Sequence, residues 1–113
     1  MFVKNLTSPR TGNAVANQFI IRHEGNFYFQ SYNSLCAVVD WSQGGDEVNA
    51  HYMDNVVTLG RDWDYSRTTM KYLNEFLREY ASSVFDWFDM EVNASNIRKL
   101  IAQGVIRYND SMR

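Results

Sequence analysis

The stretch that decides the fold is residues 15–41, VANQFIIRHEGNFYFQSYNSLCAVVDW, because its apolar runs are separated by two short polar segments. The segment Glu24-Gly25-Asn26 supplies the glycine that a tight hairpin turn requires, and Tyr32-Asn33-Ser34 is typical of a second turn. The pattern predicts an antiparallel strand before each turn and a third strand over Leu35–Trp41. Because this third strand is apolar on both faces apart from Asp40, we expect it inside the sheet.

Downstream, the clearest helix begins after Ser66, which has the side chain of a helix N-cap. Tyr65 and Met70 have the spacing of a hydrophobic staple across this N-terminus. An apolar stripe with helical spacing follows, and it should lie on the sheet: Met70, Leu73, Phe76, Leu77 and Tyr80. The opposite face should be exposed: Arg67, Lys71, Asn74, Glu75 and Arg78.

A second helix is expected after Asn93, with Val92 and Ile97 as its staple and an end at Gly104. Short strands are expected at Val56–Leu59 and at Val105–Tyr108. The first thirteen residues contain the only proline, and they predict a segment that is irregular or lies along the edge of the sheet. Residues 47–54 predict neither a helix nor a strand.

Together these segments predict an α+β fold in which an antiparallel sheet of three to five strands packs against two helices. The 113 residues fit one domain, and no repeat or linker divides residues 1–113. Hydrophobic residues form 45% of the chain, which favours a folded core over disorder. Seven Phe, seven Tyr and three Trp are more rings than so small a core can hide, so some should reach the surface.

A net charge of −2 gives no general attraction to phosphate backbones or anionic membranes. No stretch is long and apolar enough to be a signal peptide or a membrane span. Cys36 is the only cysteine, and its apolar surroundings predict a small buried side chain. We therefore expect a soluble protein of a reducing cytoplasm, or of the host cytoplasm if the protein is encoded by a phage.

No pattern in the chain predicts catalytic, cofactor-binding or metal-binding residues. His23 and His51 share no ligand spacing, and Gln43-Gly44-Gly45-Asp46 lacks the context of a phosphate-binding loop. Acidic groups occur at Asp62 and Asp64 and again over 86–91, and such groups can bind a hard cation or share a proton. Helix-dipole and solvation roles are the favoured explanation. We expect a protein without enzymatic activity or cofactor.

A local basic and aromatic group precedes and opens the first helix, and it is the best nucleic-acid candidate in the chain. Its residues are Arg61, Trp63, Tyr65, Arg67 and Lys71. The alternative is that the cations form the solvated face of an amphipathic helix, while Trp63 and Tyr65 fill the core beside the helix start.

Three motifs carry a family resemblance: VANQFII at residues 15–21, FQSYNS at 29–34, and WDYSRTTMKYLNEFL at 63–77. The chain resembles a family of small phage and bacterial domains of unknown function in which these motifs follow one another. Residues 96–108 resemble that family's closing helix and strand, whereas residues 43–53 and 81–92 depart from its shorter connections. The resemblance implies an α+β fold and a phage-type accessory protein, with no activity or site residues to carry over.

The favoured hypothesis is a protein that acts by protein–protein interaction, including inhibition of a host defence component. Its expected interface is the aromatic and acidic segment with Phe85, Trp87 and Phe88, since aromatic side chains dominate protein interfaces. The partner would be a host protein or a second copy of the chain. Nucleic-acid binding through the basic and aromatic group is the alternative.

Overall fold

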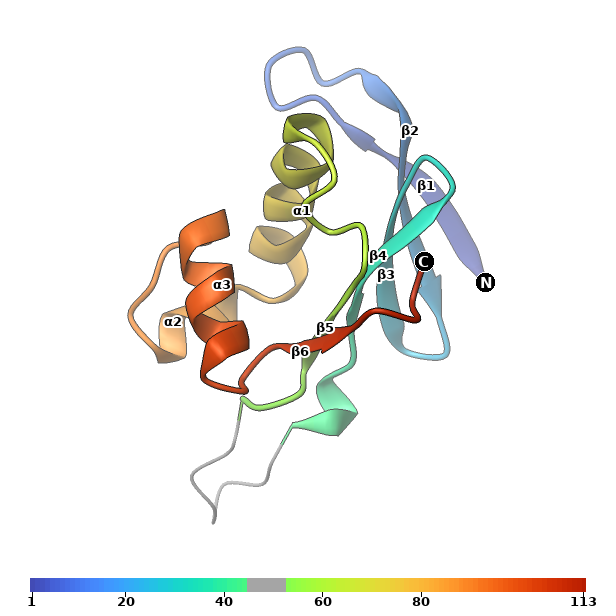
Figure 1. The fold of residues 1–113 in the computed structure, drawn as a ribbon. Coiled ribbons are helices and arrows are strands. Elements are labelled where there is room, and N and C mark those ends of the chain that lie inside the picture. Colours follow the sequence, from blue (N-terminus) through green and yellow to red (C-terminus); the bar gives the residue numbers. More distant parts are fainter. Residues whose placement is uncertain (45–52) are drawn as a thin grey trace.

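The computed structural model describes residues 1–44 and 53–113, which form a curved six-stranded sheet with the helices on one side of it (Figure 1). The strands are β1 (Phe2–Thr7), β2 (Ala14–His23), β3 (Asn26–Ser31), β4 (Ser34–Val39), β5 (Val57–Gly60) and β6 (Arg107–Asn109). The helices are α1 (Arg67–Tyr80), α2 (Ser82–Trp87) and α3 (Ala94–Ala102), with a short 3₁₀ turn η1 (Trp41–Gln43). The α+β class is confirmed.

The strands follow chain order across the sheet, and each neighbouring pair is antiparallel except β5 and β6, which are parallel. The predicted hairpin between β2 and β3 is confirmed: Glu24 and Gly25 form a two-residue turn and both have positive φ. A second two-residue turn, Tyr32 and Asn33, joins β3 to β4. The strand predicted to be interior, β4, lies between β3 and β5.

The sheet has more strands than the three to five predicted, because residues 2–7 form an edge strand, with a register shift between Asn5 and Thr7, rather than an irregular segment. Only Leu6 of β1 is buried, so this strand is stabilised by its pairing with the long β2 and not by a core-facing pattern of its own. The third predicted strand also ends earlier than expected. Asp40 caps η1 by accepting a hydrogen bond from the Ser42 amide, so Trp41 lies beyond β4.

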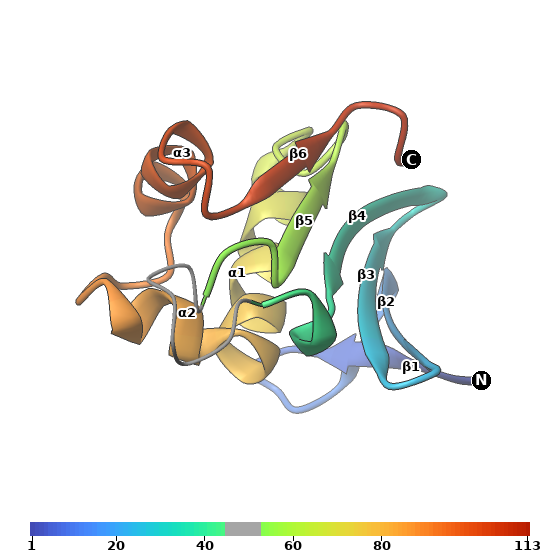
Figure 2. The same cartoon turned by 90° about the horizontal axis from the view of Figure 1, so that it is seen from below.

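Helix α1 lies along the concave side of the sheet, where it contacts β2, β3 and β4 (Figure 2). Ser66 is its N-cap as predicted, and its buried residues include Leu73, Phe76 and Leu77. Tyr65, in contrast, is 77% exposed, so the predicted packing of this ring against Met70 does not bury it. The core is therefore built between the apolar stripe of α1 and the inner face of the sheet, where Phe29 stacks on Phe76.

The two remaining helices close one end of the core. Residues 81–92, which depart from the family's shorter connections, contain α2, which buries Val84 and Phe85. The α3 prediction is confirmed, with the Asn93 side chain accepting from the Asn96 amide and with Gly104 at φ 78° just after the helix. The unassigned segment 47–54, the divergent loop 43–53 and His51 lie wholly or mostly outside the described residues.

Candidate functional site

A pocket with a volume of about 440 Å³ lies between the β3–β4 turn and the segment that leads into α1. Two of the sequence motifs, 29–34 and 63–77, supply most of its wall although they are far apart in the chain. Its lining residues are Ser31, Tyr32, Asn33, Ser34, Cys36, Asp62, Tyr65 and Thr69. The lining is therefore rich in hydroxyl groups and has a single carboxylate.

The first wall is the β3–β4 turn, whose backbone fixes the position of Tyr32. The Tyr32 amide donates to the Asn17 carbonyl at 2.6 Å, and the Gln30 side-chain amide donates to the Tyr32 carbonyl at 2.8 Å. Tyr32 has φ 55°, a left-handed conformation that is uncommon outside glycine and asparagine. This geometry leaves the Tyr32 side chain 51% exposed beside the pocket.

The second wall is the segment before α1, which is anchored by Trp63. This indole is only 5% exposed, and the Arg98 guanidinium lies 5.2 Å from its ring centroid. Arg98 also forms an ion pair with Asp64 at 3.7 Å. Because Trp63 is held inward, its neighbours Asp62 and Tyr65 lie at the pocket.

Two polar contacts join the walls. The Ser34 hydroxyl donates to the Asp62 carboxylate at 2.8 Å, which links the turn to the segment before α1. The Ser31 and Thr69 hydroxyl oxygens are 3.0 Å apart in the interior, which links β3 to α1. The Ser66 hydroxyl in turn donates to Thr69 Oγ1 at 3.1 Å. The pocket hydroxyls are thus largely engaged with one another and with Asp62.

Cys36 lies in the pocket lining, and its buried position confirms the sequence prediction. Burial raises the pKa of the Cys36 thiol to about 11, and the negative charge of Asp62 acts in the same direction. The thiol therefore stays protonated near neutral pH, where a thiolate would be needed for nucleophilic chemistry.

Gln18, from the motif at residues 15–21, is the direct strand partner of Ser31 and is fully buried. Neither atom of its side-chain amide has a hydrogen-bond partner among the residues that the structure describes. The three motifs therefore meet at one place in the fold: Gln18 beside Ser31, and Ser31 against Thr69. Sequence reasoning missed this cluster, although a glutamine within an apolar strand was the available signal.

The residues of the expected aromatic interface do not share one surface. Phe85 is 1% exposed and belongs to the core, so in this fold it cannot contact a partner. Phe88 is partly buried and packs against the same core. Trp87 is 57% exposed, so of the three it is the side chain that extends furthest into solvent. A role of Trp87 in an interface stays a prediction.

The basic and aromatic group is also divided by the fold. Trp63 is buried beneath Arg98 and cannot stack on a base in this conformation. Arg61, Arg67 and Lys71 are exposed, as is Tyr65. The remaining exposed set has one aromatic ring instead of two.

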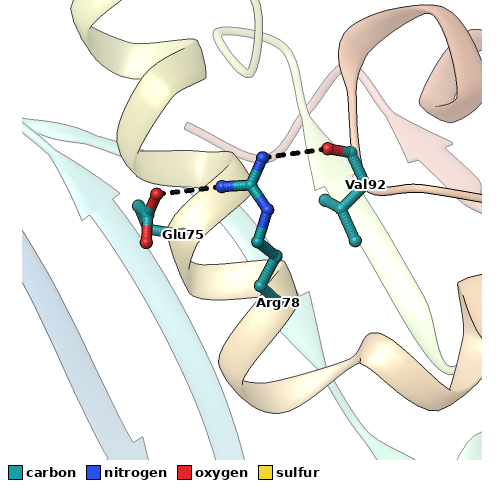
Figure 3. Close-up of polar contacts among 3 residues, drawn as sticks. All are labelled: Glu75, Arg78 and Val92. Atoms are coloured by element: carbon teal, nitrogen blue, oxygen red, sulfur yellow. Dashed lines mark hydrogen bonds and ion pairs between the residues drawn. The ribbon is translucent and has the colours of Figure 1, made fainter. Parts of the chain in front are cut away.

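Arg78, in the last turn of α1, forms hydrogen bonds with other residues of the chain (Figure 3). One of its guanidinium nitrogens donates to Glu75 at 2.9 Å and another donates to the Val92 carbonyl at 3.2 Å. Arg78 therefore ties α1 to the segment before α3.

The outer face of the sheet is a second surface of interest, because the helices lie on the opposite side (Figures 1 and 2). Val3, Ile21, Tyr28 and Val38 are successive cross-strand partners in β1 to β4. Val3 is exposed, and the other three are half-buried. Such a row of apolar side chains on an uncovered sheet face is typical of an interaction surface.

Within residues 1–44 and 53–113, no group of three or more His, Cys, Asp or Glu side chains is placed to hold a metal ion. In the same ranges no helix has the length and apolar character needed to cross a bilayer.

A comparison with protein families gives a match over residues 1–89 to a family described as a family of unknown function (DUF8033). The match spans β1 to α2 and includes all three motifs, whereas α3 and β6 lie beyond it. No curated protein and no solved structure matches the chain. Since the family match covers most of its residues, the chain belongs to DUF8033, a family of unknown function.

Proposed function

We propose that this protein acts by binding another protein, and that the pocket between the β3–β4 turn and the start of α1 is the recognition site. One observation carries this proposal: Tyr32 and Tyr65 line the pocket and are 51% and 77% exposed. Tyrosine combines a large apolar ring with a polar end, and it is enriched among the residues that dominate binding energy at interfaces.

The state of the pocket side chains supports binding rather than catalysis. The Ser31, Thr69 and Ser34 hydroxyls are engaged in hydrogen bonds, and the Cys36 thiol is protonated near neutral pH. The residues that line the pocket in the described chain include no histidine that could serve as a general base. A site of this kind suits the binding of a side chain of a partner protein.

The family resemblance of the three motifs extends the proposal to biological context. On that basis we propose a phage-type accessory protein that acts in the cytoplasm of a host cell and inhibits a host defence component. The resemblance implies the phage-type context but no activity, and the family has no assigned function, so inhibition of a defence component is a further proposal about the partner.

The experiment is an affinity capture from nuclease-treated host lysate with tagged wild type and a Tyr32→Asn/Tyr65→Ala double variant. Asparagine is chosen at position 32 because it tolerates the positive φ of that residue. Tyr108→Ala is the matched control, since Tyr108 is exposed on β6 and lies outside the pocket lining. We expect a stoichiometric protein partner that the double variant loses and the control retains.

Equal capture by wild type and double variant would contradict this placement of the site. A Trp87→Ala/Phe88→Ala variant tests the interface predicted from the sequence in the same assay. Material captured only from a parallel lysate without nuclease would instead support nucleic-acid binding through the exposed part of the basic and aromatic group, Arg61, Tyr65, Arg67 and Lys71.

Self-association is the second candidate, and the uncovered apolar row on the outer sheet face favours it. A second copy could cover this face in an isologous contact, because the same side chains would meet one another. Light scattering of the wild type and of a Tyr28→Lys variant tests this. A monomer at all concentrations would exclude it, whereas a dimer that Tyr28→Lys dissociates would support it.

A further inference from the structure

The charge of the pocket is set by one side chain. Among the described residues that line it, Asp62 alone has a formal charge at neutral pH, and the others are hydroxyl, amide, thiol and phenol groups. A buried or half-buried carboxylate attracts a cationic group more strongly than one in bulk water, because the surrounding dielectric is lower. An anionic guest would meet the Asp62 carboxylate without compensation.

The hydrogen-bonding capacity of Asp62 is only partly used. One of its oxygens accepts from the Ser34 hydroxyl at 2.8 Å, and this bond fixes the orientation of the carboxylate. An ionised carboxylate has about four acceptor positions, so further N–H donors can be accommodated. The Ser31 and Thr69 hydroxyls bond to each other, and the Ser34 hydroxyl is committed to Asp62. Among the described lining residues, the Asp62 carboxylate is the acceptor that carries a charge, and it has capacity left for a cationic donor.

The tyrosine rings add a second feature that suits a cation. An ammonium or guanidinium group is attracted to the face of an aromatic ring within about 6 Å of its centroid. The described chain already contains such pairs at Phe27, Tyr72 and Trp63, with Arg22, Lys71 and Arg98 respectively. None of these three rings lines the pocket, whereas Tyr32 and Tyr65 do.

Two exposed cations, Arg61 and Arg67, lie close to the pocket in sequence but are not part of its lining. They reduce the long-range attraction for a positively charged partner surface. Short-range contact with Asp62 would therefore decide recognition, which favours a single cationic side chain over a strongly basic segment.

We infer that the pocket receives one lysine or arginine side chain of the partner protein, with Asp62 as its counter-ion and Tyr32 and Tyr65 against its alkyl stem and charge. This inference rests on the proposed function, whose recognition site it specifies. It assigns the kind of residue that the partner presents.

The test is a titration of the ¹⁵N-labelled full chain with four matched pentapeptides, acetyl-Gly-Ser-X-Ser-Gly-amide, in which X is lysine, arginine, norleucine or glutamate. We expect the lysine or arginine peptide to shift the amide resonances of Ser34 and Tyr65. Its affinity should exceed that of the norleucine peptide at least tenfold, which corresponds to about 1.4 kcal/mol. Added salt should weaken this preference.

Asp62→Asn is the matched variant, because an asparagine side-chain oxygen can still accept from Ser34 while the charge is removed. It should abolish the preference for the cationic peptides. Asp86→Asn, which removes an exposed charge on α2 outside the pocket lining, should leave the preference unchanged. The wild-type comparison of lysine, arginine and norleucine peptides stands without either variant if one of them fails to fold.

Equal shifts with the norleucine peptide would overturn the inference and leave the pocket as a recognition site. Preference for the glutamate peptide, or no shift with any peptide at 10 mM, would also overturn it. The proposed function fails separately, when the Tyr32→Asn/Tyr65→Ala variant captures its partner as well as the wild type does.

Discussion

The hydroxyl of Ser31 on β3 and the hydroxyl of Thr69 on α1 lie 3.0 Å apart inside the protein, and this contact fixes the helix start against the sheet. Both residues are buried, so a hydroxyl that loses its partner also loses access to water.

Thr69→Val should therefore lower the free energy of unfolding by about 1–3 kcal/mol, because it leaves the Ser31 and Ser66 hydroxyls without their partner at position 69. Ser31→Ala should have a smaller effect, since Thr69 keeps its contact with Ser66. Urea denaturation of the single and double variants forms a double-mutant cycle. Strict additivity of the two changes would show that the contact contributes nothing.

Gln18→Met should leave stability unchanged or raise it. The glutamine amide is fully buried and has no partner among the described residues, so its desolvation is not offset. Methionine has a similar length and no group that requires a hydrogen bond. Thermal unfolding of the variant and of the wild type measures the change. A loss of more than about 1 kcal/mol on Gln18→Met would indicate that the amide is satisfied in solution.

Alkaline pH should destabilise the wild type relative to a Cys36→Ala variant. The pKa of the folded thiol is about 11, above its ordinary value of 9.0, so the folded state binds more protons than the unfolded state between these values. The contribution of the protonated Cys36 thiol to the free energy of unfolding is fully present below pH 9 and is lost as the pH rises towards 11. Tyr80, whose pKa burial raises to about 12, is shared by both proteins. Parallel pH profiles of urea unfolding for the two proteins would contradict the prediction.

Gly60→Ala should destabilise the protein by about 1–3 kcal/mol or more, as overpacking does in closely packed interiors. A Cβ at this position would lie 2.5 Å from the Leu35 carbonyl oxygen and 2.7 Å from that of Met112. Both are backbone atoms that cannot rotate away. Thr58→Ala, in the same strand, is the control for loss of strand propensity. A melting temperature equal to that of the control would disprove the close approach.

The helices and hairpins were predictable because their signals are local. Ser66 and Asn93 are recognisable N-caps, and the apolar stripe of α1 has helical spacing. The turn at Glu24 and Gly25 follows equally from its neighbours. In contrast, β1 has one buried side chain among six and depends on β2, so its own sequence carries little pattern.

The pocket was not predictable for a related reason. Ser31 and Thr69 are 38 residues apart in sequence, and hydroxyl side chains follow no period that marks them as neighbours. Phe85 of the expected interface lies in the core because the short helix α2 turns it inward, whereas Trp87 is exposed. A composition rich in rings does not say which rings the helix buries.

The parallel pairing of β5 with β6 constrains the order in which the protein folds. Strands β1 to β5 form antiparallel pairs in chain order, and the pairs from β1 to β4 join strands that are close in sequence. In the parallel pair, Thr58 of β5 faces Arg107 of β6, and the chain between them contains α1, α2 and α3. Closing so long a segment has a larger entropic cost than closing a two-residue turn, and it is compensated only after the helices have packed. The hairpins at β2, β3 and β4 can therefore form early, while β6 joins the sheet last and should be the first strand to exchange its amide protons when the native state opens.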